Sequence, residues 1–89
     1  MLDEGLAEAS AVLGRLAAAQ VAYERAVRLQ PENGDAWYQL GRFHYESRCD
    51  PKTALLYLDR SWHLDPLSID TNALLDIVKP RAAAGRDCR

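Results

Sequence analysis

The side chains of this 89-residue sequence that could do chemistry are two histidines, two cysteines and scattered serines and acids. His44, Cys49 and Asp50 are close in sequence, but a metal site needs three or four converging ligands. His63 has no partner set by spacing, and the interval from Cys49 to Cys88 predicts neither a disulfide framework nor a paired-ligand site. No serine lies in a GxSxG context, and the five glycines form no phosphate loop. The sequence therefore predicts a protein that is not an enzyme and that holds no metal or cofactor.

Composition and charge narrow the kinds of partner. The chain is 48% hydrophobic and 27% charged, which is typical of one globular domain. Residues 1–78 carry seven basic and twelve acidic side chains, a net charge of −5, whereas residues 79–89 carry +3. An acidic body is a poor match for nucleic acid, and no apolar run approaches the ~20 residues of a membrane span. We therefore expect no nucleic acid, no membrane and, because the start resembles no export signal, a cytoplasmic location.

The elements that must position these residues are helices. Apolar residues recur at helical spacing, and no stretch alternates as a strand would. Gly14 indicates a tight turn, Asp35, Asp50 and Ser68 are good N-caps, and Pro80 is a stop signal. Residues 80–89 are predicted to form a flexible basic tail. The prediction is an all-α fold of five helices, at 3–13, 16–29, 35–47, 51–64 and 68–79.

The chain also contains an internal repeat. Residues 19–31 align without gaps on residues 54–66 at an offset of 35, which places Ala19 opposite Ala54 and Tyr23 opposite Leu58. Residues 5–14 align on residues 39–48 at an offset of 34. The difference of one predicts an extra residue within 47–50, between the two helices of the second unit.

This repeat resembles the tetratricopeptide repeat, in which two antiparallel helices fill about 34 residues. The second unit follows the family pattern with Trp37-x2-Leu40-Gly41-x2-His44, then Ala54-x3-Leu58, then Pro66. The first unit is degenerate, with Asp3 at the tryptophan position. The resemblance implies an α-α superhelix with repeat one at 1–32, repeat two at 33–66 and a capping helix at 67–79. It also implies a protein–protein interaction module that binds a protein or peptide on its concave face.

The resemblance further implies which residues line that concave face. They are the residues at the groove positions of each first helix and of the capping helix: Glu4, Glu8, Asp35, Tyr38, Arg42, Tyr45, Asp70, Ala73 and Ile77. Tyr38, Arg42 and Tyr45 follow i, i+4 and i+7 and so share one helix face. Chaperone-binding members hold a terminal carboxylate with lysine and asparagine, which Glu4, Glu8, Tyr38 and Arg42 replace here. We therefore expect a basic or aromatic ligand segment, with Arg42 binding one acidic group.

The last helix suggests an alternative function. It is apolar on more than one side, although a terminal repeat helix should expose a polar face. The apolar residues are Leu67, Ile69, Leu74, Leu75, Ile77 and Val78. This excess predicts a covered surface, which would make the chain a self-associating or scaffolding domain, a homodimer through this helix or an accessory fragment of a larger protein.

Overall fold

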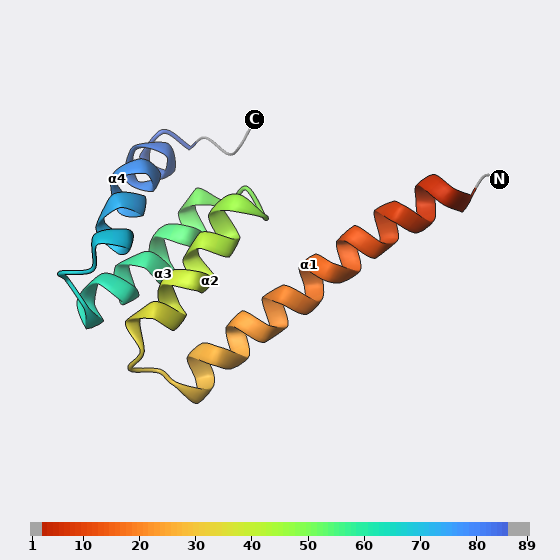
Figure 1. The fold of residues 1–89 in the computed structure, drawn as a ribbon. Coiled ribbons are helices and arrows are strands. Elements are labelled where there is room, and N and C mark those ends of the chain that lie inside the picture. The colour runs from red at the N-terminus through yellow and green to blue at the C-terminus, as the bar shows by residue number, and fades with distance from the viewer. Residues whose placement is uncertain (1–2, 86–89) are drawn as a thin grey trace.

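The computed structural model describes the backbone of residues 3–85 and the side chains of residues 14–85. Within this range the chain is entirely helical, and Figure 1 shows the order of its elements. The helices are α1 (Asp3–Leu29), α2 (Gly34–Glu46), α3 (Pro51–Leu64) and α4 (Ile69–Ala83). The all-α class is confirmed, but four helices are present where the sequence predicted five.

The missing helix boundary is at Gly14. Residues 3–13 and 16–29, predicted as two helices, form the single 27-residue helix α1, which runs straight through Gly14. One glycine costs a helix only about 1 kcal/mol relative to alanine, and the flanking residues are mostly strong helix formers. The predicted turn was therefore wrong, and repeat one does not fold into a hairpin in this structure.

Helices α2 and α3 form the antiparallel hairpin predicted for the second unit. The two helices approach each other closely at Gly41, where an added Cβ would lie 2.8 Å from Cγ of Leu58 and 3.2 Å from the carbonyl oxygen of Ala54. Side chains cap both starts, because Asn33 accepts a hydrogen bond from Asp35 N and Asp50 accepts one from Thr53 N. The N-cap of α2 is thus Asn33, not the predicted Asp35.

The loop between α2 and α3 holds the extra residue that the two repeat offsets located within 47–50. Cys49 has a left-handed φ of 55°, which turns the chain so that Asp50 N–H bonds the carbonyl of His44 at 2.9 Å. Cys49 is also disulfide-bonded, which the cysteine spacing did not predict.

Helix α4 does not end at Pro80 as predicted but continues to Ala83. Ala82 is buried, and Ala84 N–H bonds the carbonyl of Pro80 at 3.0 Å, so packing and the last turn hold the helix together. Residues 80–83 therefore belong to α4 and not to a flexible tail. Residues 86–89 lie outside the described part of the chain.

The hydrophobic core lies mainly among α2, α3 and α4. Ala54, Leu58, Leu75 and Val78 form its largest buried cluster, and α1 packs chiefly on α2 through Val27. The N-terminal half of α1 extends away from the other helices (Figure 1). The chain thus consists of a closed body of three helices and one long, partly unpacked helix.

Candidate functional site

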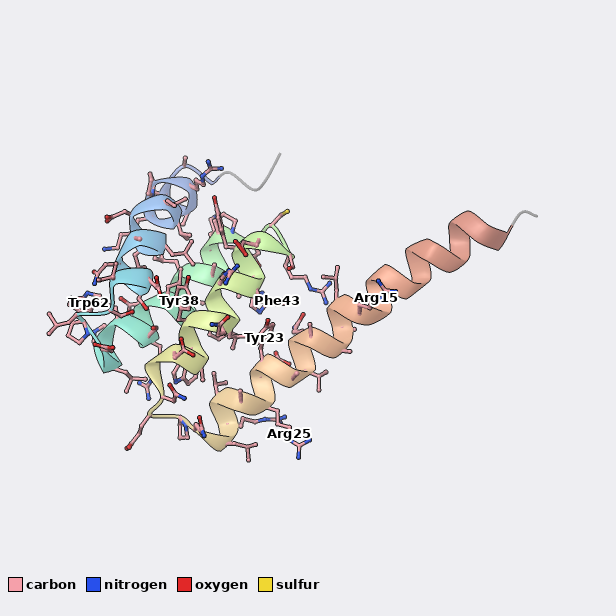
Figure 2. All side chains as sticks on the ribbon, viewed as in Figure 1. Arg15, Tyr23, Arg25, Tyr38, Phe43 and Trp62 are labelled. Carbon is pink, nitrogen blue, oxygen red and sulfur yellow. The ribbon has the colours of Figure 1, made fainter. Side chains whose placement is uncertain are left out.

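The three residues predicted to share a face of α2 do share one. Tyr38 and Tyr45 are half-buried and pack on the cluster of Ala54, Leu58, Leu75 and Val78, while Arg42 between them is exposed. Figure 2 shows the labelled Tyr38 on the side of α2 that lies toward α3 and α4. The tyrosines are therefore partly core residues, which fixes their orientation and leaves a portion of each accessible.

Arg42 is held in place by its own helix. Its Nε donates to Oε1 of Glu46 at 2.8 Å, one helical turn away. This hydrogen bond is the main cause of the raised pKa of Arg42, so the guanidinium stays charged. Because Nε alone makes this bond, the remaining N–H groups can point toward a ligand acceptor.

Helix α4 contacts this face through Arg81. Ala73 and Ile77, which the resemblance implied as groove residues, are exposed, and Arg81 follows at the same spacing of four. The guanidinium of Arg81 lies 6.0 Å from the ring centroid of Tyr45, a cation–π contact that joins α4 to α2. We call Tyr38, Arg42, Tyr45, Ala73, Ile77 and Arg81 the α2–α4 face. Sequence reasoning missed Arg81 because it placed this residue in the tail, although its spacing from Ile77 could have revealed it.

Two of the predicted acidic residues lie at the N-terminal end of this face, three residues before Tyr38 and Ala73 respectively. Asp35 is exposed in the first turn of α2, and Asp70 is exposed in the first turn of α4. Glu4 and Glu8 belong to the part of α1 that extends away from the body, and their side chains lie outside the described residues. The α2–α4 face therefore has tyrosine and arginine side chains at its centre, where Glu46 pairs with Arg42.

His44, the histidine nearest to Cys49 and Asp50, is part of the core. It is only 8% exposed, its ring lies 5.2 Å from that of Tyr57, and neither ring nitrogen has a hydrogen-bond partner. Burial lowers its pKa below the ordinary value near 6.5, against the opposing charges of Asp50 and Glu24. His63 is exposed and bonds only its own helix, through the carbonyl of Asp59. Among the residues that the structure describes, no group of three His, Cys, Asp or Glu could hold a metal ion.

Some of the apolar residues of the last helix are buried in the core, and others are exposed. Leu75 and Val78 are buried and Leu74 is half-buried, whereas Leu67 and Ile69 are 88% and 84% exposed.

Among the described helices, none is long and apolar enough to cross a membrane.

These observations define an all-helical repeat protein with an exposed tyrosine and arginine face and no evident catalytic centre among its described side chains. A family model described as tetratricopeptide repeat matches residues 2–43. This match supports assignment of the chain to the tetratricopeptide repeat family, whose repeats generally mediate protein–protein interaction and are typically non-catalytic. No curated protein and no solved structure gives a significant match.

Proposed function

We propose that the chain is a protein-interaction module that binds a peptide segment of its partner on the α2–α4 face. The cation–π contact between Arg81 and Tyr45 is the observation that carries this proposal, because it joins two helices into one continuous surface. Tyrosine and arginine are enriched among the residues that dominate binding energy. The tyrosines are also held by the core beneath them, so little side-chain freedom is lost on binding.

The charge of this face indicates the ligand. With Glu4 and Glu8 on the outlying part of α1, the groups nearest its centre are two tyrosines, the guanidinium groups of Arg42 and Arg81, and the Glu46 carboxylate that pairs with Arg42. Guanidinium groups bind carboxylates with charge-assisted hydrogen bonds, and tyrosine rings pack on other aromatic rings. An extended peptide with both acidic and aromatic residues fits this surface, which keeps the aromatic part of the basic or aromatic segment expected from the sequence and replaces the basic part.

Selection from a random-peptide display library tests the proposal. We expect the selected peptides to be rich in acidic and aromatic residues and to lose at least tenfold in affinity with Arg42→Glu or Arg81→Glu. Lys52→Glu, an equal charge change at an exposed position of α3, should leave affinity nearly unchanged. Circular dichroism confirms that each variant folds. The proposal would be contradicted if the peptides bound the Arg42→Glu and Arg81→Glu variants with the same affinity as the wild-type chain.

Self-association through the start of α4 is a second candidate, favoured by the exposure of Leu67 and Ile69. Under this hypothesis Leu67→Asp and Ile69→Asp abolish a dimer that is seen by light scattering. Retention of the dimer in both variants would contradict it.

A further inference from the structure

The first unit of the repeat has a partly covered surface whose counterpart in the second unit is completely covered. Ala54 and Leu58 on α3 are 0% exposed because Gly41 of α2 lies against one side of them and Leu75 and Val78 of α4 pack with them. Their equivalents on α1, at an offset of 35, are Ala19 and Tyr23, and both are only half-buried. The helix that would cover them by analogy with α2 is residues 3–13, which aligns on α2 at an offset of 34.

That helix cannot reach the partly covered surface of its own chain in this structure. Because α1 is continuous through Gly14, residues 3–13 point along the helix axis and away from residues 16–29. Tyr23 packs on one side against Phe43 of α2, with ring centroids 5.4 Å apart, and also borders a hollow of about 170 Å³ between α1 and α2. The part of Ala19 and Tyr23 that stays exposed is therefore open to a segment from another chain.

We infer that residues 3–13 of a second copy of this chain cover the Ala19–Tyr23 surface, so that two α1 helices pair antiparallel in a swapped dimer. The register comes from the second unit. There Gly41 lies against Ala54 and Leu58, which places Ala7 of one copy against Ala19 and Tyr23 of the other.

A second contact in the closed unit gives the same register. Arg60 lies over the ring of Trp37 at 5.7 Å, and the equivalents in the first unit are Arg25 and Asp3. A pairing of residue 3 with residue 25 has its midpoint at residue 14, so the two-fold axis passes near Gly14. Each copy then gives and receives the same contacts, as a two-fold interface requires.

The charges of α1 are complementary in this antiparallel arrangement. Residues 3–13 carry Asp3, Glu4 and Glu8 and no basic residue. Residues 15–29 carry three arginines against Glu24, and both Arg25 and Arg28 are exposed. Antiparallel pairing places the acidic half of each helix beside the basic half of the other, whereas parallel pairing would place like charges together.

The exchange of charge between Asp3 and Arg25 tests this inference in the full chain. Light scattering coupled to size-exclusion chromatography should give twice the monomer mass for the wild-type chain. Asp3→Arg or Arg25→Asp alone should weaken the dimer about tenfold, because each substitution occurs in both copies and so disrupts two charge pairs. The double variant should restore wild-type affinity, and Lys52→Asp on α3 should change nothing.

A mixture of isotope-labelled and unlabelled chains gives an independent readout that does not depend on any variant. We expect intermolecular nuclear Overhauser effects between the Tyr23 ring and residues 3–13 of the other copy. A chain that stays monomeric at high micromolar concentration would overturn the inference. So would a dimer whose affinity ignores the charge exchange, or one that Ile69→Asp disrupts instead, which would place the interface on α4.

Discussion

The two repeat units have related sequences but different conformations, and the difference shows what closes a helical hairpin. The second unit has Asp50 and Pro51 between its helices, an N-cap followed by a residue that cannot continue the preceding helix. The first unit has only Gly14, with no proline or N-cap beside it. Strong turn signals close the second unit, whereas a single glycine leaves the first open as one helix.

The largest loss of stability is expected from a substitution of the buried leucine in the closed second unit. Leu58→Ala removes a side chain that is 0% exposed and should cost about 2–5 kcal/mol of unfolding free energy. The equivalent change in the open unit, Tyr23→Ala, should cost less because Tyr23 is half-buried. Urea denaturation measures both, and Leu56→Ala, at a 72% exposed position of α3, is the control. Equal losses at Leu58 and Tyr23 would contradict the difference in packing.

The two glycines should respond in opposite directions. Gly41→Ala places a Cβ 2.8 Å from Cγ of Leu58 and should destabilise the chain by about 1–3 kcal/mol. Gly14→Ala meets nothing within 4 Å and should increase the stability of α1 by about 1 kcal/mol. Thermal unfolding and helical circular dichroism, both at concentrations where the chain is monomeric, measure the pair. A loss of helix with Gly14→Ala would show that Gly14 forms a turn.

A hydroxyl group distinguishes the units at another aligned position, where Ser61 on α3 corresponds to Ala26 on α1. Ser61 is 0% exposed, and its Oγ lies 2.8 Å from the carbonyl of Gly34 and 2.9 Å from Oγ1 of Thr71. Ser61→Ala leaves Thr71 without this partner and should cost about 1–2 kcal/mol. Ala26→Ser, at a half-buried position, should cost less. Urea denaturation checks this, and no change with Ser61→Ala would mean that these hydrogen bonds add no net stability.

The smallest effect near neutral pH should come from His44. Because burial holds its folded pKa below the unfolded value near 6.5, the unfolded chain binds the proton first as the pH falls. The contribution of His44 to stability is therefore complete above about pH 6.5 and is lost as the pH falls toward the folded pKa. Stability measured from pH 7.5 to 5 should follow this course in the wild-type chain.

His44→Phe keeps an aromatic ring at this position and should remove that part of the pH dependence. His63→Gln, at an exposed position, should retain it. An unchanged pH profile in His44→Phe would assign the dependence to other groups.

Much of the fold followed from local signals in the sequence. The bounds of α2 and α3 were predicted within one residue, because proline and capping side chains mark their ends. The offsets of 34 and 35 located the extra loop residue, which the structure accommodates with Cys49 in a left-handed conformation. The errors at Gly14 and Pro80 arose where one helix-breaking residue opposed neighbours that favour helix or that are buried.

The candidate site was less predictable than the fold. Helical spacing correctly placed Tyr38, Arg42 and Tyr45 on one face, but it could not show that both tyrosines rest on the core. The positions of Glu4 and Glu8 depended on a hairpin that does not form here, and Arg81 was assigned to the tail. Contacts between helices decide such features, and a sequence pattern within one helix does not contain them.

The continuity of α1 through Gly14 is the central claim, because both the open first unit and the swapped dimer depend on it. Backbone ¹³Cα chemical shifts of residues 11–18 in the wild-type chain test it without any substitution. We predict helical shifts at every position, including Gly14 and Arg15. A return to random-coil shifts at residues 14–16, with helical shifts on both sides, would show a closed hairpin and contradict the account.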